Sequence, residues 1–394
     1  MAKEKNEDVL KNIISMDHFN TKLKFIKTGI DIFDAYMAGE KTINVPDIGL
    51  AVGKIIGLAG PNGVGKSTLM LDICKRFCKQ GYKILYLDVE RGLNIKSLRT
   101  YGLLEYAAYN AELEFETSAD KIYELKKKWL KQFLEGEKLF YTVSPRTYTE
   151  AQCIIRDIFN SNKKGEIKLI VIDSIKDLIA TKLQDDMEHL ENQKMMIDAS
   201  SQEYFLIALK DFISLQECVC VVLNQFRISV KGQFYVNDEA GGNAWKHRTD
   251  IRILMKEREK IKQKTVNNMN EVVEKQIGNF VELEMRKGRF GNPFTKLLLP
   301  LIFGSGVSMV SLYSRKLEDL GYIKKKGAGW TTIDIPELEI NENFQGESKR
   351  IKVIKENFSK IHEFIMKNNL ICVENEDFDK ANKEVNLKEE YFEE

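Results

Sequence analysis

Residues 60–68 of this chain read GPNGVGKST, and this stretch decides the fold. It matches the pattern G-x-x-x-x-G-K-[ST] throughout. The apolar run KIIGLAG (54–60) precedes it, and the amphipathic run KSTLMLDICKRFCKQG (66–81) follows it. The sequence therefore predicts a strand, a phosphate-binding loop and a helix in direct succession.

The residue types of this loop suit the binding of phosphate groups. The glycines let backbone N–H groups turn toward an anion, and the N-terminus of the following helix adds partial positive charge. Lys66 supplies a cation for the β- and γ-phosphates, and the Ser67 hydroxyl is a candidate Mg²⁺ ligand. The expected nucleotide contacts are Gly60, Pro61, Asn62, Gly63, Val64, Gly65, Lys66, Ser67 and Thr68. The alternative is a chance glycine-rich turn.

Two carboxylates downstream argue against a chance turn. The apolar run LIVIDS (169–174) predicts a buried strand with Asp173 at its carboxyl end, where α/β sheets bind nucleotides. Asp173 is expected to hold Mg²⁺ through water; the alternative is an ordinary strand-ending aspartate. Glu90, which ends another predicted strand, is a candidate for orienting the attacking water. Its alternative is a plain surface glutamate, and Asp88 lies two residues deeper on the same face.

Short apolar segments alternate with amphipathic segments over the first two thirds of the chain. Expected strands are 54–60, 83–90, 138–144, 167–174 and 218–225, and expected helices are 66–81, 119–136, 149–161 and 200–217. This alternation predicts an α/β fold with a central, mostly parallel sheet covered on both faces. Residues 248–259 and 279–290 alternate like strands and are expected to add an antiparallel pair.

Changes in composition divide the chain into four expected regions. They are an N-terminal helix and linker (1–24), a nucleotide-binding core (25–303), a small α+β C-terminal domain (304–370) and an acidic tail (371–394). The tail is acidic because residues 373–394 carry nine acidic and three basic side chains. In the small domain we expect a helix at 310–321 and helical structure over 349–367.

The overall composition is that of a soluble globular protein of 394 residues. Lys and Arg (60) balance Asp and Glu (59), so any nucleic-acid surface has to be local. No apolar run approaches the roughly 18 residues of a membrane span, and the N-terminus lacks the apolar core of a signal peptide. We therefore expect no membrane association and a cytoplasmic location. The six cysteines include no C-x-x-C pair and are expected to be reduced thiols.

Taken in chain order, the motifs resemble those of the RecA family of DNA recombinases. The resemblance covers roughly residues 25–330 and adds several segments to the motifs already quoted. These segments are KTGIDIFDAYMAG (27–39), LNQFR (223–227), EAGGNAWKH (239–247), RKGRFGNPF (286–294) and GSGVSMVSLYSRKLEDLGYIKKKGAGW (304–330). The resemblance implies a RecA-like ATPase core that uses ATP and Mg²⁺.

The resemblance also implies roles for individual residues. Glu90 would activate water, and Gln225 would contact the γ-phosphate and relay its presence to the segment that follows. Lys287 and Arg289 would act in trans, on ATP bound by the adjacent protomer, where transition-state charge spreads. From the residues alone, these two cations read as solvated charges on a strand.

The stretch from Gln225 to Gly241 resembles a DNA-binding loop of the family. The candidate DNA contacts are Arg227, Lys231, Phe234, Gly241 and Gly242. The cations suit phosphates, the aromatic ring suits stacking on bases, and the glycines let the chain return tightly to the sheet. The alternative is a polar hairpin with an incidental aromatic. Asp238 and Glu239 count against a simple cradle for DNA.

The chain departs from the family pattern in several places. Residues 182–202, which match the first DNA-binding loop of the family, contain no glycine and several acids. An aromatic residue that stacks on adenine in many members falls near Ser97. Residues 103–137 and 256–278 look longer than the family norm. These departures indicate a divergent member, and an origin in a phage or another mobile element is one hypothesis.

The main functional expectation is an ATP-dependent DNA recombinase, a DNA-dependent ATPase that forms helical filaments on single-stranded DNA and exchanges strands with duplex DNA. Two alternatives stay open from the sequence. One is a ring-forming helicase or translocase on the same fold. The other is a nucleotide-gated assembly protein that does not process DNA. Filaments as opposed to rings, and DNA-stimulated ATP turnover, separate the three.

Overall fold

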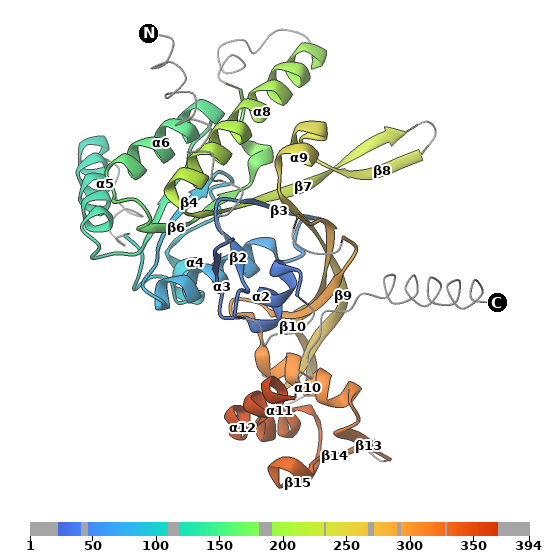
Figure 1. Ribbon diagram of the computed structural model, residues 1–394. Helices are drawn as coiled ribbons and strands as arrows, with labels where there is room; N and C mark the ends of the chain where they lie inside the picture. Colours follow the sequence, from blue (N-terminus) through green and yellow to red (C-terminus); the bar gives the residue numbers. More distant parts are fainter. Residues whose placement is uncertain are drawn as a thin grey trace, which may run out of the picture.

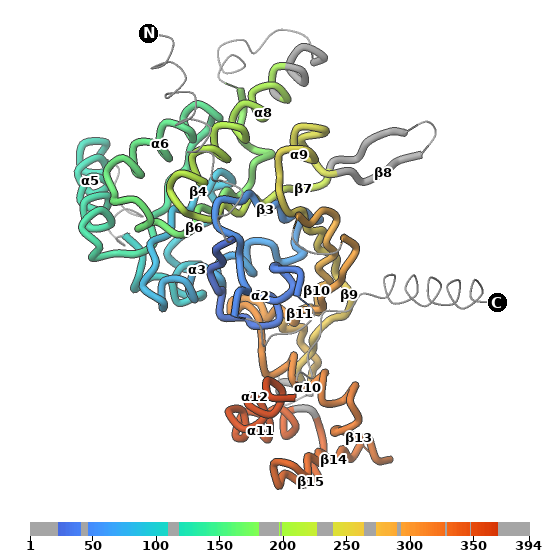
Figure 2. Tube along the Cα trace, in the orientation of Figure 1, coloured from blue at the N-terminus to red at the C-terminus, as the bar shows by residue number. Residues whose placement is uncertain are grey.

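The computed structural model describes residues 23–40, 46–108, 118–180, 191–231, 234–266, 272–289, 293–327 and 329–368. Within these residues a large sheet forms the centre of the molecule, with helices on both of its faces (Figure 1). A smaller antiparallel sheet and three helices form the C-terminal part, and Figure 2 traces the path of the chain from blue to red.

Six neighbouring strands of the large sheet run parallel, in the order β9-β3-β7-β6-β4-β5. Their bounds are Ile55–Gly60 (β3), Lys83–Asp88 (β4), Phe140–Val143 (β5), Ile167–Asp173 (β6), Val219–Lys231 (β7) and Ile251–Val266 (β9). This arrangement confirms the predicted α/β fold with a mostly parallel central sheet.

An antiparallel extension completes the large sheet beyond β9. It consists of β10 (Val272–Lys287), β11 (Lys296–Ile302) and β12 (Gly306–Val307). The antiparallel pair predicted at 248–259 and 279–290 is confirmed as β9 and β10, which are longer than expected. Near the N-terminus, β1 (Phe25–Ile26) pairs with β2 (Leu50–Ala51), and α2 (Asp31–Ala38) lies between them in the chain.

Alternation along the parallel strands sends side chains into two apolar clusters, one on each face of the sheet. In β4, for example, Ile84 and Tyr86 belong to one cluster and Leu85 and Leu87 to the other. The first cluster contains α3 (Lys66–Lys79); the second contains α5 (Ala119–Leu134), α6 (Tyr148–Asn160) and α8 (Glu191–Gln216). Because both faces are covered, the parallel strands are apolar almost throughout.

Three short helices border the sheet near the ends of its strands. They are α4 (Ile95–Thr100), the 3-10 turn η3 (Ile175–Asp177) and α9 (Gly242–Arg248). Helix α9 packs closely against β3 at Gly57. A Cβ on Gly57 would lie 2.5 Å from the ring of Trp245, which belongs to α9 and is fully buried.

The C-terminal part packs α10 (Met309–Asp319), α11 (Glu347–Glu356) and α12 (Phe358–Lys367) with strands β13, β14 and β15. The strands are Ile323–Lys326, Trp330–Ile335 and Ile340–Gln345, and the 3-10 turn η4 (Pro336–Leu338) joins the last two. This confirms a small α+β unit. The helical segment predicted over 349–367 is interrupted at Asn357, whose side-chain amide donates to the carbonyl of Val353 (3.0 Å).

Two further findings concern the cysteines and the helices of the described residues. Five of the six cysteines lie within the described residues, and all five are free thiols. Among the described helices, none combines the length and the apolar composition that crossing a lipid bilayer requires.

Candidate nucleotide-binding site

The carboxyl ends of four neighbouring parallel strands bring the predicted site residues together. Gly60 at the end of β3 is in register with Gln225 of β7, and Asp173 at the end of β6 is in register with Asp88 of β4. The phosphate loop follows β3 directly. One edge of the sheet therefore carries the loop, two acidic strand ends and the predicted γ-phosphate sensor.

The loop itself depends on glycine at two positions with left-handed backbone. Gly63 has φ 77° and Gly65 has φ 103°, and a Cβ on Gly65 would lie 2.8 Å from Leu301 Cδ1. Helix α3 then runs for 14 residues from Lys66, with no acidic side chain in its first turn. Its N-terminal N–H groups and its dipole favour an anion in the loop.

Lys66 holds its ammonium group inside the loop. Its Nζ donates to the carbonyl oxygens of Gly60 (3.0 Å) and Pro61 (2.9 Å), and the side chain is buried. Burial lowers the pKa of Lys66, while attraction to Asp173 and Glu90 acts in the opposite direction. The ammonium therefore lies among carbonyl and carboxylate oxygens, where phosphate oxygens could take over the same donors.

The predicted metal ligands contact each other. Ser67 Oγ donates to Asp173 Oδ2 (2.8 Å), and Tyr86 OH donates to the same oxygen (2.7 Å). Burial raises the pKa of Asp173, although both hydrogen bonds act to lower it. Among the described residues, no group of three or more His, Cys, Asp or Glu side chains is placed so that it could hold a metal ion by itself. The pair thus fits a Mg²⁺ ion that also takes phosphate and water ligands, which is the usual mode for this cation.

The two acidic residues at the carboxyl end of β4 have different partners. Asp88 accepts hydrogen bonds from the backbone N–H groups of Gly92 and Leu93, both at 3.0 Å, and so shapes the turn. Glu90 is exposed at the edge of the sheet, and its Oε1 accepts from Gln225 Nε2 (2.5 Å). Of the two, Glu90 is the one whose carboxylate is open to a bound water.

Sequence reasoning missed three side chains of this site. Tyr86 supports Asp173, Tyr101 OH lies 3.0 Å from Thr68 Oγ1, and Lys176 Nζ donates to Gln225 Oε1 (2.9 Å). An aromatic inside a strand is typical of a core residue, and a lysine in a turn is typical of a solvated charge. No spacing in the sequence distinguishes these three from such residues. The position near Ser97 has a local role, since Ser97 and Asn94 form a capping box for α4.

The segment after Gln225 is a strand pair and not the expected loop. β7 continues from the sheet edge to Lys231, and β8 (Phe234–Glu239) returns antiparallel to it, with Phe226 opposite Glu239 and Lys231 opposite Phe234. The expectation of a loop was wrong because the stretch alternates β-branched and aromatic residues, a pattern typical of strands. The side chains of Arg227, Lys231 and Phe234 lie outside the described part of the structure.

The base of this β7–β8 hairpin is fixed to the site. The backbone N–H of Ala240 donates to the carbonyl of Gln225 (3.0 Å), and Asn224 Nδ2 donates to the carbonyl of Ala240 (2.8 Å). Gly241 and Gly242 both have positive φ, and a Cβ on Gly241 would lie 2.5 Å from the Gln202 side chain. The predicted tight return of the chain to the sheet therefore needs glycine here.

Glu239 is held at the hairpin base by other side chains. Its carboxylate accepts from Trp245 Nε1 and pairs with Arg252 Nε (3.2 Å). Its charge is therefore neutralised within the protein. Of residues 182–202, the part from Glu191 onward is helical within α8, and 182–190 lies outside the described residues.

Lys287 and Arg289 lie at the other edge of the sheet. β10 is antiparallel to β9, and β9 is parallel to β3, so the carboxyl end of β10 meets the amino end of β3. Arg289 Nε pairs with the buried Asp250 (3.1 Å), whose backbone N–H donates to the carbonyl of Ile55 (2.8 Å). Lys287 Nζ donates to three carbonyls near the end of α9, those of Lys246, His247 and Thr249. One chain therefore does not bring these cations to its own phosphate loop.

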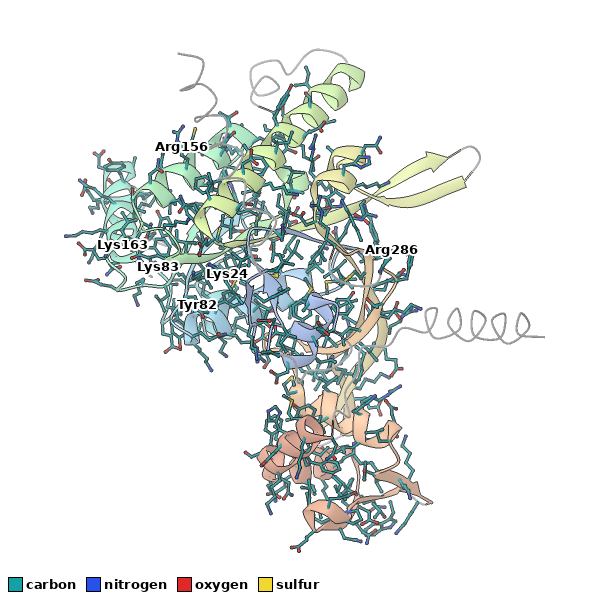
Figure 3. All side chains as sticks on the ribbon, in the orientation of Figure 1. Lys24, Tyr82, Lys83, Arg156, Lys163 and Arg286 are labelled. Atoms are coloured by element: carbon teal, nitrogen blue, oxygen red, sulfur yellow. The ribbon has the colours of Figure 1, made fainter. Side chains whose placement is uncertain are left out.

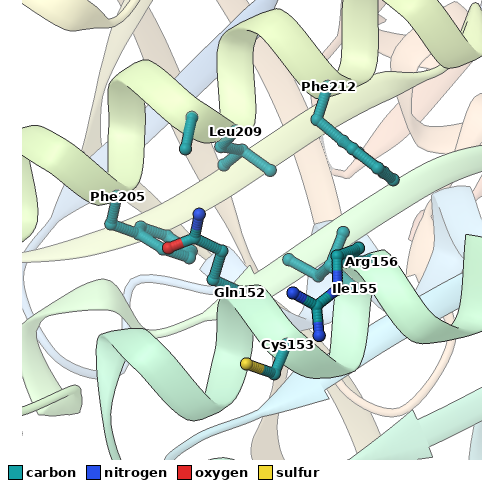
Figure 4. A pocket seen from close by; sticks show the side chains of 8 residues that line it. Gln152, Cys153, Ile155, Arg156, Phe205, Leu209 and Phe212 are labelled. Carbon is teal, nitrogen blue, oxygen red and sulfur yellow. The ribbon is translucent and has the colours of Figure 1, made fainter.

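A separate apolar groove of about 290 Å³ lies between α6 and α8 (Figure 4). Ile155, Phe205, Leu209 and Phe212 line it, with the Arg156 guanidinium beside them. None of the predicted site residues contributes to this groove. Its chemistry is that of a packing surface and not that of a phosphate site.

Comparisons with known proteins find one matching family and several similar proteins. The family described as RecA N-terminal domain matches residues 134–308. Protein RecA of Phytoplasma mali (strain AT) is 28% identical over 321 residues, covering 80% of this chain and 79% of the relative. The chain is similar to members of the RecA family.

Other proteins are similar to this chain over most of its length. Protein RecA of Anaplasma marginale (strain Florida) is 26% identical over 304 residues, covering 76% of this chain and 71% of the relative. Protein RecA of Ehrlichia chaffeensis (strain ATCC CRL-10679 / Arkansas) is 25% identical over 341 residues, covering 86% and 80%. At these identities the chain is only distantly similar to these proteins.

Proposed function

We propose that this protein belongs to the RecA family and is an ATP-dependent DNA recombinase of the cytoplasm. It would bind ATP with Mg²⁺, form helical filaments on single-stranded DNA and pair that strand with homologous duplex DNA. The observation that carries the proposal is a single connected site. The phosphate loop, the Ser67–Asp173 pair and Glu90 lie at the sheet edge from which β7 continues into the hairpin.

Each residue of the site would have a separate role in phosphoryl transfer. Backbone N–H groups of the loop and Lys66 would bind the phosphates, and Ser67 and Asp173 would hold the cation. Mg²⁺, when bound, neutralises charge on the β- and γ-phosphate oxygens. Glu90 would orient the attacking water, since its carboxylate is exposed beside the loop. Gln225 would donate to the terminal phosphate through the amide N–H group that now meets Glu90.

The hairpin would carry the DNA contacts. Arg227 and Lys231 supply cations for the DNA backbone, and Phe234 supplies a ring on which bases can stack. Two observations support a hairpin whose position depends on bound ATP. Gln225 belongs to β7, the first strand of the hairpin. The backbone N–H of Ala240, which follows the second strand, donates a hydrogen bond to the carbonyl of Gln225.

The placement of Lys287 and Arg289 supports assembly into a homo-oligomer. The contacts of these cations lie at the amino end of β3, and the phosphate loop begins at its carboxyl end, five residue steps or roughly 17 Å away at about 3.3 Å per residue. A neighbouring protomer stacked on the sheet edge would place its own Lys287 and Arg289 at the nucleotide. Cations contributed in this way stabilise the charge of the transition state.

Lys66→Ala tests the ATPase part of this proposal. Losing the phosphate-binding ammonium should lower the DNA-stimulated ATP turnover by at least about a hundredfold, as removal of one preorganised donor does elsewhere. Lys79→Ala, at the exposed end of the same helix, is the matched control and should keep normal turnover. Normal turnover of Lys66→Ala would contradict the assigned site.

Strand exchange between a single strand and a homologous duplex tests the recombinase part. The proposal expects ATP-dependent exchange, and filaments in electron micrographs with DNA and a slowly hydrolysed ATP analogue. Hexameric rings without exchange would favour a helicase or translocase. ATP binding without DNA-stimulated turnover would favour a nucleotide-gated assembly protein.

A further inference from the structure

Lys176 contacts the γ-phosphate sensor proposed above, although the functional roles described so far do not include it. It lies in η3, the turn that directly follows β6, and its side chain is half-buried. Ser174 Oγ donates to Asp177 Oδ2 (2.5 Å) across this turn and fixes its shape. Because β6 and β7 are neighbours in register, the turn places Lys176 beside the end of β7, where its Nζ donates to Gln225 Oε1 (2.9 Å).

The two partners of Gln225 select one orientation of its amide group. An ammonium group can only donate hydrogen bonds, so Lys176 takes the carbonyl oxygen Oε1. An ionised carboxylate can only accept them, so Glu90 takes the amide nitrogen Nε2. With both partners present, the N–H face of the amide points toward Glu90. If the amide were rotated by 180°, its oxygen would face the Glu90 carboxylate, so that two acceptors would meet. Its N–H group would face the Lys176 ammonium group, so that two donors would meet.

The lysine charge lies within electrostatic reach of the nucleotide site. Lys176 contributes to lowering the pKa of Lys66, behind the larger effect of burial. A phosphate group bound at Lys66 would therefore be close to the Lys176–Gln225–Glu90 chain. The same Nε2 group that meets Glu90 is the donor that a terminal phosphate would take.

We propose that Lys176 is a positioning residue: it holds the Gln225 amide with its N–H face toward the nucleotide, and so sets the coupling between the terminal phosphate and the β7–β8 hairpin. This inference rests on the proposed function for its consequence, but its structural part concerns only the Lys176–Gln225 contact. Without Lys176, the amide can present its oxygen to the phosphate, and the two oxygens repel.

The first test compares Lys176→Ala, Lys176→Arg and wild type. Affinity for a fluorescein-labelled oligothymidylate is measured without nucleotide and with a slowly hydrolysed ATP analogue, and affinity for a fluorescent ADP is measured separately. In Lys176→Ala the gain in DNA affinity caused by the ATP analogue should fall about tenfold, the effect expected when a hydrogen bond to a charged group is lost. ADP affinity should change much less than this gain, because ADP lacks the phosphate that Gln225 would contact.

Controls separate positioning from general damage. Lys176→Arg keeps a donor-only cation and should restore most of the gain. Lys163→Ala, an exposed lysine before the amino end of β6 that is labelled in Figure 3, should behave as wild type. An undiminished gain in Lys176→Ala, or an equal loss of ADP affinity, would overturn the proposal.

A second measurement does not depend on DNA. In a double-mutant cycle of Lys176→Ala and Gln225→Ala, the free energies of unfolding should be non-additive, because the two side chains contact each other. If wild type shows no nucleotide-dependent gain in DNA affinity, the proposed function fails, and this cycle alone decides the contact. Additive effects would overturn the role of Lys176.

Discussion

Gln225 connects the proposed ATP site with the proposed DNA-binding hairpin. Its side chain contacts Glu90 and Lys176 beside the phosphate loop, and its main chain belongs to the strand that continues into the hairpin. In the proposed function, a phosphate that accepts from the amide nitrogen would draw Gln225 away from Glu90. The Glu90 carboxylate would then be free to accept from water when ATP is bound.

A buried carboxylate near the N-terminal strands predicts a pH effect on stability. Burial raises the pKa of Asp34 from its ordinary value of 3.8 to about 7, although hydrogen bonds from the backbone of Thr28 and Gly29 act in the opposite direction. Between these two values the folded protein holds a proton that the unfolded chain has lost. The free energy of unfolding should therefore fall as pH rises from about 4 to about 7, by at most about 1.4 kcal/mol per pH unit.

Asp34→Asn provides the comparison for this prediction. The amide does not titrate, so its stability should fall less steeply than that of wild type over the same window. Urea unfolding at several pH values measures both slopes. Parallel slopes for the two proteins would show that Asp34 does not titrate in this range.

At the level of residues, the sequence indicated the groups with a fixed place in a motif or at a strand end. Lys66, Ser67 and Asp173 are of this kind, and the structure brings them to one edge. Lys176 and Tyr86 could not be predicted, because they reach the site across neighbouring strands. Such contacts depend on strand order and side-chain direction, which residue spacing does not encode.

At the level of elements, local pattern located most strands and helices within a few residues of their observed bounds. The exceptions have physical causes. β7 runs past its predicted end at 225 because alternating β-branched and aromatic residues continue to favour strand. α8 starts at Glu191 and not, as the sequence predicted, at residue 200. The acidic residues of this region drew attention away from the helix-forming residues between 191 and 200. Asn357 divides the last predicted helix by bonding its side chain to the preceding turn.

The hairpin as an element should account for most of the affinity for single-stranded DNA. The double substitution Arg227→Ala and Phe234→Ala removes one cation and one stacking ring, and should weaken DNA binding at least about tenfold. The dependence of affinity on salt should also become less steep, by about one unit of the log–log slope. Fluorescence anisotropy at several salt concentrations measures both effects.

The control for the hairpin is the double substitution Arg156→Ala and Tyr123→Ala, an exposed arginine on α6 and an exposed tyrosine on α5. This variant should bind DNA normally. Nucleotide affinity should be unchanged in both variants, since all four positions lie on elements other than the phosphate loop. Equal loss of DNA and nucleotide binding in the hairpin variant would indicate a structural role for the hairpin instead.

At the level of the whole molecule, the sheet separates two sets of charged groups. The phosphate loop occupies its carboxyl edge, and Lys287 and Arg289 lie at the amino edge of the same strands. The sequence indicated both sets but not their separation, which follows from the antiparallel direction of β10. A complete ATP site would therefore need two protomers.

Mixing two inactive proteins tests this division between protomers. Lys66→Ala lacks the phosphate cation, and the double variant Lys287→Ala with Arg289→Ala lacks the trans cations, so each should lose most ATP turnover. In mixed filaments some interfaces would join an intact phosphate loop to intact trans cations. ATP turnover should then recover in part on mixing. No recovery, with filaments still visible by electron microscopy, would indicate that the cations act within their own chain.

The central claim is that one site couples ATP to DNA through Gln225. ATP turnover of wild type and of Gln225→Ala, each with and without single-stranded DNA, tests it most directly. We predict that DNA raises the turnover of wild type at least about tenfold, an effect of about 1.4 kcal/mol on the barrier, and that Gln225→Ala loses this stimulation while still binding ADP. Turnover that does not respond to DNA in wild type, at any salt or Mg²⁺ concentration, would contradict the claim.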